Sequence, residues 1–238
     1  MFERKKRPFV SAVIVAAGDA SRMEGIDKQL LDIGGVPVVI RSILAFEQSR
    51  KVDEIIVVTK KESIPELNRQ VREFACDKVK FIVKGGDSRQ QSVFCGIQCV
   101  DERCAYVAVH DGARPMVLTD AVDGCIDDAV EYGAALLAVR VKDTIKAADA
   151  QNMVERTVSR DNLYSAQTPQ IFEIGLYRRA MQMALDRGTD YTDDCQLVEA
   201  AGQKVYLSQG DDSNIKITTP DDIPFAEALL AQREGNFL

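Results

Sequence analysis

The sequence predicts an α/β protein with a doubly wound, mostly parallel sheet that carries an inserted β-hairpin arm. Short apolar runs rich in Val and Ile alternate along the chain with amphipathic stretches of helical periodicity. The runs are apolar throughout, which is typical of strands covered by helices on both faces. The length of 238 residues fits one large α/β domain. We therefore expect a single domain over residues 1–238, with the arm at about 140–160.

The elements follow from this pattern in chain order. The expected strands are Val10–Ala16, Glu54–Thr59, Lys80–Val83, Tyr106–His110, Ala134–Val139 and Lys204–Leu207. The expected helices are Val38–Glu47, Ile64–Phe74, Ser88–Val100, Asp120–Glu131, Leu176–Asp186, Asp193–Ala201 and about 221–233.

One segment departs from the alternation of strand and helix. Val141–Lys146 and Met153–Val158 are extended in character and are separated by the polar stretch Ala147–Asn152. This pattern predicts the β-hairpin arm. Because so small a hairpin is marginally stable alone, we expect it to pack against something, such as a second subunit.

The amino-acid composition limits the kinds of molecule that the protein is expected to bind. The formal net charge is −7 and Trp is absent, which disfavours a nucleic-acid-binding surface with clustered cations and stacking aromatic rings. A local basic pocket for a small phosphorylated ligand remains compatible with this charge.

Targeting and redox signals indicate a cytoplasmic protein. No apolar run reaches transmembrane length, and we expect the basic run at 4–7 to be a solvated tail rather than part of a signal peptide. The 6 cysteines form no C-x-x-C pair, and with 1 His the chain lacks zinc-ligand spacing. Both features suit a reducing compartment without a structural zinc.

The loop after the first strand is the strongest functional signal. Small residues from Ala16 to Gly18 would let backbone N–H groups approach a phosphate, and Arg22 and Lys28 add positive charge. The loop lacks the G-K-[ST] of a Walker A motif and the later glycines of a dinucleotide-binding fingerprint. By itself the loop is also compatible with an ordinary surface connection, so this alternative stays open.

Polar residues after later strands are further candidates. Asp111 stands at the carboxyl end of a strand, where open α/β sheets bind ligands. His110 ends the same buried strand without a nucleophile nearby, and we expect it to be structural. Asp87 stands at a helix start, where it or Ser88 could instead serve as an N-cap. Asp193, with the next aspartate, could bind a metal, but acids at a helix N-terminus are the commoner explanation.

These motifs together resemble a known family. The run from Ala16 to Met23, followed by Lys28-Gln29, resembles the signature of the sugar-phosphate nucleotidyltransferases. The subset with Lys-Gln is similar to the 2-C-methyl-D-erythritol 4-phosphate cytidylyltransferases of non-mevalonate isoprenoid synthesis. The resemblance extends from Val10 to about Leu230. Further matching segments are Gly85–Val93, His110–Pro115, Asp143–Lys146 with Arg160, Thr168–Gln170 and Asn214–Thr218.

The chain departs from the family pattern at a few positions. Ala20 replaces a frequent glycine, and Asp27 replaces a frequent proline before the lysine. Gly112 stands where alanine is common, a change that removes only a methyl group. Ala20 fits the same loop only if its φ is negative.

The resemblance implies a Mg²⁺-dependent enzyme that transfers a cytidylyl group from CTP to 2-C-methyl-D-erythritol 4-phosphate. Ribitol 5-phosphate or another polyol phosphate is the alternative acceptor, and a catalytically silent nucleotide-binding regulator is a third possibility. The presence of the expected cations disfavours the regulator. The catalytic residues implied are Arg22, Lys28 and Lys216.

The resemblance also implies binding roles and a homodimer. Thr144 and Arg160 would reach across on the arm to complete the partner subunit's sugar-phosphate site. Asp111 would contact both the substrate and the metal. The residues implied for CTP are Ala16, Ala17, Gly18, Gly86, Asp87, Ser92 and Gly112. Those implied for the polyol phosphate are Asp111, Arg114, Thr144, Arg160, Thr168 and Thr192.

Overall fold

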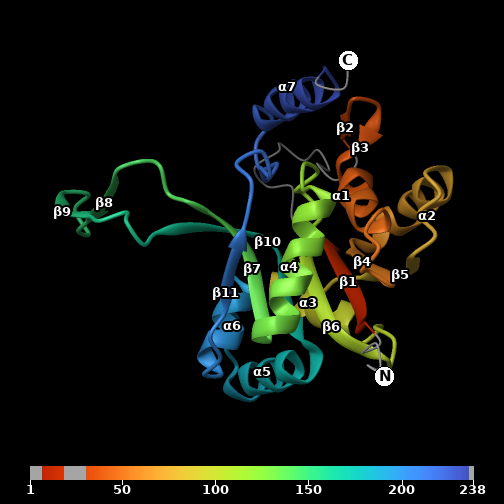
Figure 1. The fold of residues 1–238 in the computed structure, drawn as a ribbon, viewed down its shortest axis with the longest axis horizontal. Helices are drawn as coiled ribbons and strands as arrows, with labels where there is room; N and C mark the ends of the chain where they lie inside the picture. The colour runs from red at the N-terminus through yellow and green to blue at the C-terminus, as the bar shows by residue number, and fades with distance from the viewer. Residues whose placement is uncertain (1–6, 19–30, 236–238) are drawn as a thin grey trace, which may run out of the picture.

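A seven-stranded sheet in the order β11-β7-β10-β6-β1-β4-β5 forms the centre of the computed structural model, which describes residues 7–18 and 31–235 (Figure 1). Every strand of this sheet except β10 runs in the same direction. The strands are β1 (Phe9–Ala16), β4 (Glu54–Thr59), β5 (Val79–Lys84), β6 (Cys104–Asp111), β7 (Ala134–Arg140), β10 (Tyr164–Glu173) and β11 (Tyr206–Gln209).

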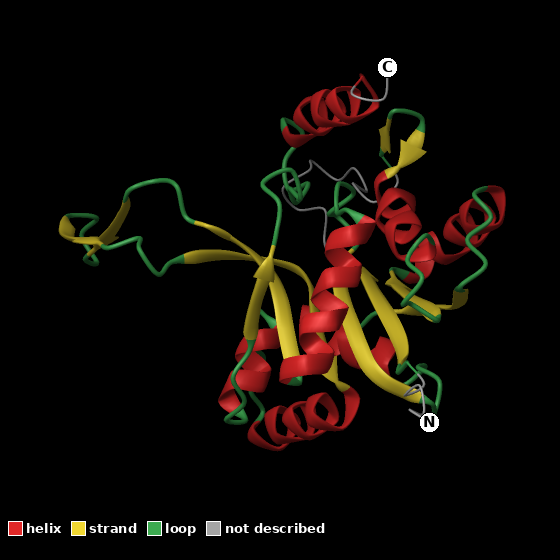
Figure 2. Ribbon diagram, in the orientation of Figure 1, coloured by secondary structure: helices red, strands yellow, loops and turns green. Residues whose placement is uncertain are grey.

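Helices cover both faces of the sheet (Figure 2). Alternate side chains of β1 point to opposite faces of the sheet. Ala12 and Ile14 therefore belong to the core formed with α1, α2 and α4, whereas Val13 belongs to the core formed with α3, α5 and α6. None of the helices in the described ranges is long and apolar enough to cross a bilayer. The helices are α1 (Val38–Glu47), α2 (Ile64–Glu73), α3 (Arg89–Ile97), α4 (Thr119–Tyr132), α5 (Ile174–Arg187), α6 (Asp194–Ala200) and α7 (Asp222–Gly235), with a 3-10 turn at Lys61–Ser63.

The doubly wound, mostly parallel sheet is confirmed, and the bounds of β4 and α1 are those predicted. The hairpin is present as β8 (Ile145–Ala148) and β9 (Val154–Val158), which pair antiparallel and project away from the sheet (Figure 1). Its first strand begins at Ile145, later than the predicted Val141, because the Val141 N–H bonds to the Leu163 carbonyl at the base of the arm and not to β9. The pairing of β8 with β9 shifts register between Ala147 and Ala148.

Strand β10 was not predicted, because the polar residues in its first half interrupt the apolar run that is typical of a buried strand. It lies between β6 and β7 and runs antiparallel to both. The side chain of Gln170 is buried, accepting a hydrogen bond from the Cys195 N–H at 3.1 Å and donating one to Asp193 at 2.5 Å. Partners distant in sequence therefore satisfy the polar groups that make this segment resemble a loop.

A small third core positions the segment after β11. Ile33, Val38, Ile217 and Ala226 are buried together where the hairpin of β2 (Asp32–Ile33) and β3 (Val36–Pro37) meets α7. The Gly34-Gly35 turn of this hairpin has φ of 56° and 74°, a conformation that glycine adopts without strain. Because Ile217 is anchored here, its neighbour Lys216 is held beside the sheet edge.

Candidate functional site

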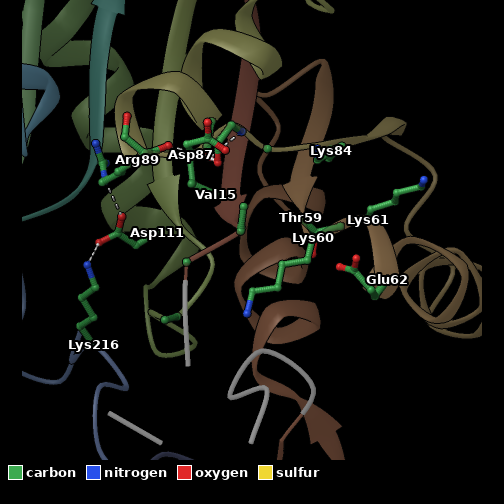
Figure 3. Close-up of a pocket in the computed structure, with 17 residues that line it drawn as sticks. Val15, Thr59, Lys60, Lys61, Glu62, Lys84, Asp87, Arg89, Asp111 and Lys216 are labelled. Carbon is green, nitrogen blue, oxygen red and sulfur yellow. Dashed lines mark hydrogen bonds and ion pairs between the residues drawn. The ribbon is translucent and has the colours of Figure 1, made fainter. Parts of the chain in front are cut away.

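A pocket of about 570 Å³ lies at the carboxyl ends of the parallel strands β1, β4, β5 and β6 (Figure 3). Residue Val15 of β1 pairs with Val58 on one side and with Asp111 on the other, so the neighbouring strands end together at this edge. Open α/β sheets bind ligands where the chain changes direction across the sheet, as it does here after β5. The lining consists of Val15, Ala17, Gly18, Thr59, Lys60, Lys61, Glu62, Lys84, Gly85, Gly86, Asp87, Ser88, Arg89, Ser92, Asp111, Ala113 and Lys216.

The turn between β5 and α3 forms one wall of the pocket. A Cβ atom at Gly85 would lie 2.5 Å from the Ala17 Cβ and 2.7 Å from the Ser92 Oγ, so only glycine lets this turn approach the loop after β1. Ser92 Oγ accepts a hydrogen bond from the Gly86 N–H at 3.2 Å and donates one to the Ser88 carbonyl at 2.8 Å. Ser88 caps α3 by accepting from the Gln91 N–H. The hydroxyl of Ser92 thus shapes the wall.

Asp111 is surrounded by cations. Lys216 Nζ lies 2.8 Å from Asp111 Oδ2, Arg89 Nε lies 3.3 Å from Oδ1, and Arg114 Nε lies 3.8 Å from Oδ2. Lys216 and Arg89 reach the carboxylate from opposite sides (Figure 3). Burial alone would raise the pKa of Asp111, but attraction to Arg89, Lys216 and Arg114 outweighs burial and holds that pKa below its ordinary value. Asp111 is therefore a permanent anion at the base of a cationic pocket.

A buried hydrogen-bond chain fixes the backbone of Asp111. Thr168 Oγ1 accepts from the Asp111 N–H at 3.0 Å and donates to His110 Nδ1 at 2.9 Å, while His110 Nε2 donates to the Arg114 carbonyl at 3.3 Å. Burial lowers the pKa of His110 to about 3, so the ring is neutral. The structural role expected for His110 agrees with these contacts. Thr168, which was predicted to bind the polyol, is buried here, and its hydroxyl is bonded on both sides.

The structure brings part of the predicted site together. The predicted residues that line the pocket are Ala17, Gly18, Gly86, Asp87, Ser92, Asp111 and Lys216. Arg22 and Lys28 lie outside the described residues. Gly112 does not line the pocket, because its N–H bonds to the Val15 carbonyl and its carbonyl accepts from Ser42 Oγ. Ala16 is buried as the last residue of β1.

Other predicted substrate residues lie away from the pocket lining of their own chain. Thr144 and Arg160 are exposed at the base of the arm, where Arg160 donates a hydrogen bond to the Lys142 carbonyl. Thr192 is exposed just before α6. Arg114 is not part of the pocket lining, although its Nε lies 3.8 Å from Asp111 Oδ2, and its Nη1 donates to the Asn214 carbonyl at 2.7 Å.

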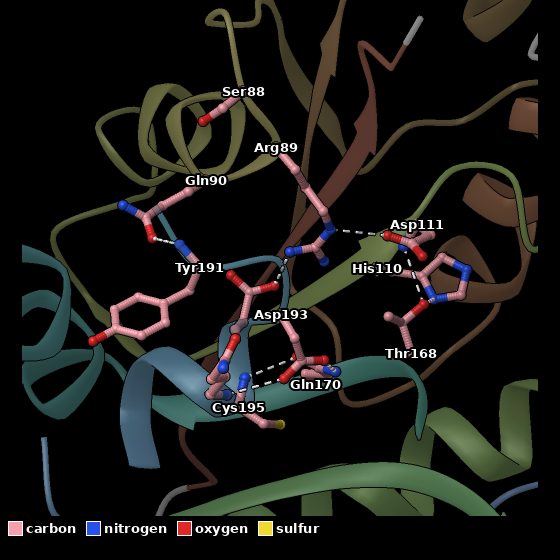
Figure 4. A network of polar contacts seen from close by, with 12 residues as sticks. Ser88, Arg89, Gln90, His110, Asp111, Thr168, Gln170, Tyr191, Asp193 and Cys195 are labelled. Carbon is pink, nitrogen blue, oxygen red and sulfur yellow. Dashed lines mark hydrogen bonds and ion pairs between the residues drawn. The ribbon is translucent and has the colours of Figure 1, made fainter. Parts of the chain in front are cut away.

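Two charged residues were missed or left ambiguous by sequence reasoning. Arg89 lines the pocket and pairs with both Asp111 and Asp194 (Figure 4), yet no role was predicted for it. Asp193 caps α6 by accepting from the Gln196 N–H at 3.0 Å, as the commoner explanation predicted. Within the described residues, no three His, Cys, Asp or Glu side chains are grouped as metal ligands.

Lysines at the rim were also missed. Lys60 and Lys61 follow β4, and Lys84 is the last residue of β5. All of them line the pocket, which lies at the carboxyl ends of these strands. Their position directly after apolar runs was the available signal, since parallel strands end at a common edge.

The fold and the pocket define an α/β protein with a cationic pocket at the carboxyl edge of its sheet. The model of the family IspD, 2-C-methyl-D-erythritol 4-phosphate cytidylyltransferase, matches residues 10–232. The chain belongs to this family.

Relatives agree over nearly the full length. A 2-C-methyl-D-erythritol 4-phosphate cytidylyltransferase from Caldanaerobacter subterraneus subsp. tengcongensis is 48% identical over 223 residues, covering 93% of this chain and 98% of the relative. The crystal structure of 4-diphosphocytidyl-2C-methyl-D-erythritol synthase from Anaerococcus prevotii superposes with a TM-score of 0.84 at 32% identity, covering 94% and 96%. The cytidylyltransferase structure from Thermus thermophilus superposes with a TM-score of 0.76 at 32% identity, covering 93% and 98%.

Proposed function

We propose that this enzyme transfers the cytidylyl group of CTP to 2-C-methyl-D-erythritol 4-phosphate in non-mevalonate isoprenoid precursor synthesis. The products are 4-diphosphocytidyl-2-C-methyl-D-erythritol and pyrophosphate. The observation that carries the proposal is the cationic pocket around Asp111 and Lys216, in a chain that belongs to a cytidylyltransferase family. The name of the family gives the acceptor, 2-C-methyl-D-erythritol 4-phosphate, and the transferred cytidylyl group, for which we propose CTP as the donor.

The reaction requires positioning and charge stabilisation. A phosphate oxygen of the polyol phosphate attacks the α-phosphorus of CTP, and the bond from that phosphorus to the β-phosphate bridging oxygen breaks. The electron pair leaves with pyrophosphate. Because the attacking phosphate is already an anion, no general base is required. The protein must hold two polyanions in line and neutralise their mutual repulsion.

Lys216 is the described cation best placed for this task. It lines the pocket, and its ammonium group is held by Asp111 rather than buried. We propose that it contacts the α-phosphate of CTP or the attacking phosphate. Arg22 and Lys28 would neutralise the remaining charge of the triphosphate, a role that rests on the family resemblance.

The walls of the pocket suit the nucleoside. We propose that the backbone near Ala17, Gly18 and Gly86 and the side chain of Asp87 contact the cytosine and ribose. Asp87 supports this role because it lines the pocket at an exposed position. Ser92 would contribute by holding the Gly86 backbone in place.

A Mg²⁺ ion fits this donor set. Asp111 offers a single ionised carboxylate at the base of the pocket, and Mg²⁺ in such sites is bound by one or two carboxylates together with substrate phosphates. Asp111 would therefore be the protein ligand, and most other ligands would come from the triphosphate and water. When bound, the ion neutralises charge on the phosphate oxygens.

The arm would make the enzyme a homodimer. Met153 and Val154 of the hairpin are 66% and 61% exposed, which is unfavourable for an isolated chain and suits a partner surface. Thr144 and Arg160 lie outside the pocket lining of their own chain, so we propose that they complete the polyol-phosphate site of the partner.

We also propose that the chain forms a single nucleotidyltransferase domain over residues 1–238 and acts in the cytoplasm. The family model spans residues 10–232, and the seven-stranded sheet draws strands from Phe9 to Gln209. All cysteines of the chain are free thiols, which suits a reducing compartment.

A substrate panel tests the function. Pyrophosphate release would be measured with CTP, ATP, GTP and UTP, each with 2-C-methyl-D-erythritol 4-phosphate or ribitol 5-phosphate and Mg²⁺. We expect the highest kcat/KM for CTP with methylerythritol phosphate. Faster release with ribitol phosphate would replace the proposed acceptor, and no release with any pair would contradict the enzymatic function.

A further inference from the structure

Arg89 joins the pocket to the helices behind it. Arg89 is the first residue of α3. Its Nε donates a hydrogen bond to Asp111 Oδ1 at 3.3 Å, and its Nη1 donates one to Asp194 Oδ2 at 2.6 Å. Figure 4 shows Arg89 between Asp111 and the start of α6, where Asp193 and Cys195 lie. One guanidinium group therefore connects a carboxylate in the pocket with a carboxylate outside it.

Asp194 is a fixed anchor for this arginine. Its side chain is 3% exposed, and its second oxygen accepts a hydrogen bond from the Tyr177 hydroxyl at 2.6 Å. Tyr177 is itself fully buried on α5. A buried ion pair is stable only when its remaining polar atoms are satisfied, and both oxygens of Asp194 are. The position of Arg89 is thus set by the packed helices α5 and α6.

The anchored arginine restricts the rotation of Asp111. Arg89 bonds Oδ1, and Lys216 Nζ lies 2.8 Å from Oδ2, so a different cation faces each oxygen. A planar guanidinium can bond two carboxylates at once, whereas one ammonium group is a single point of charge. With Oδ1 fixed, Oδ2 is turned toward Lys216.

We propose that Arg89, anchored by Asp194, is a positioning residue that fixes the Asp111 carboxylate and thereby places Lys216 for the reaction. The inference rests on the proposed function, because it takes Lys216 as a group that contacts the reacting phosphates. A purely structural role, in which the ion pair only fastens α3 to α6, is the alternative. That alternative predicts lower stability without a selective loss of turnover.

The Asp194→Asn variant separates these roles. It keeps an acceptor for the Tyr177 hydroxyl and removes the charge opposite Arg89. We expect kcat to fall about 10²-fold, the loss typical of a small displacement of a reacting group, while the KM for each substrate changes less than about threefold.

Glu54→Gln is the matched control. Glu54 is a buried carboxylate at the start of β4, at the other end of the strand from the pocket, and it accepts from Ser11 Oγ at 2.6 Å and the Asp101 N–H at 2.7 Å. We expect this variant to lower the Tm while kcat measured well below the Tm stays at the wild-type value.

A double variant, Arg89→Gln with Asp194→Asn, removes both buried charges. It tests the positioning role if the Asp194→Asn variant alone does not fold. The same loss of kcat is expected. A kcat within about threefold of wild type in the folded variant would overturn the positioning role. Wild-type turnover is measured in the same assay with CTP and methylerythritol phosphate. Its absence would contradict the proposed function, whereas normal wild-type turnover with an unaffected variant contradicts the positioning role alone.

Discussion

The charges around Asp111 illustrate how single residues set the chemistry of the pocket. Lys216 and Arg89 each bond a different oxygen of this carboxylate, and the whole chain carries a formal charge of −7. A polyanionic substrate can bind an acidic protein only where cations are gathered locally. The contribution of each cation at this point is therefore large and measurable.

Replacement of Lys216 by alanine should lower kcat by about 10²–10³-fold, because one fixed positive charge is lost from the transition state. Steady-state kinetics with CTP and methylerythritol phosphate measures the loss. Lys204→Ala is the matched control, because Lys204 is exposed and does not line the pocket. Equal kinetics for the two variants would remove Lys216 from the reaction.

His110 makes stability depend on pH. Its pKa is lowered by burial to about 3 in the folded chain, against 6.5 for an ordinary histidine. As pH falls below 6.5, the unfolded chain therefore binds a proton that the native chain does not, and the free energy of unfolding decreases. Between pH 8 and pH 5 the decrease from this residue is about 2 kcal/mol.

Urea unfolding of the wild type and of His110→Gln at both pH values checks this expectation. The carboxylates titrate in both proteins, so the difference between the two pH dependences isolates the histidine. A variant with the same pH dependence as wild type would show that the pKa of His110 is the same in the native and unfolded chains, and that burial does not lower it.

At the scale of elements, helix α3 must lie close to the sheet to present Arg89 and Ser92 to the pocket. A Cβ atom at Gly96 would stand 2.5 Å from Val13 Cγ1 and 2.9 Å from Val58 Cγ2. We expect Gly96→Ala to destabilise the protein by about 1–3 kcal/mol, because the added methyl group overpacks the contact of α3 with β1 and β4.

Gly124→Ala is the matched control for Gly96→Ala. Gly124 lies in α4, is exposed, and would have open space around an added Cβ. Alanine should therefore stabilise this helix by about 0.5–1 kcal/mol. Thermal and urea denaturation of both variants measures the contrast. A Gly96→Ala protein as stable as Gly124→Ala would mean that α3 can move away from the sheet freely.

The elements also show where sequence reasoning reaches its limit. The bounds of β4 and α1 were predictable because β4 is a short run that is buried throughout, whereas the apolar residues of α1 recur at helical spacing. Strand β10 was not, since Gln167, Thr168 and Gln170 are polar and find their partners only in the folded chain. Arg89 was missed for the same reason. Its anchor, Asp194, is 105 residues away, and no local pattern reports such a pair.

At the scale of the whole molecule, the proposed dimer would divide the site between the pocket of one chain and the arm of the other. Asp111 and Lys216 belong to the pocket of one subunit, whereas Thr144 and Arg160 are carried on the arm and do not line that pocket. In a closed dimer each arm would serve the other subunit. An inactive variant with a substitution in the pocket should therefore regain activity when it forms a dimer with an inactive variant that has a substitution on the arm.

Mixed dimers of Lys216→Ala and Arg160→Ala test this arrangement. Each variant alone should be nearly inactive. After random exchange of equal amounts, about half of the dimers are mixed, and each mixed dimer contains one site with an intact Lys216 and an intact partner arm. Activity should thus recover to about a quarter of the wild-type value. Light scattering must show dimers throughout, and the absence of recovery in exchanged dimers would place Arg160 in its own chain's site.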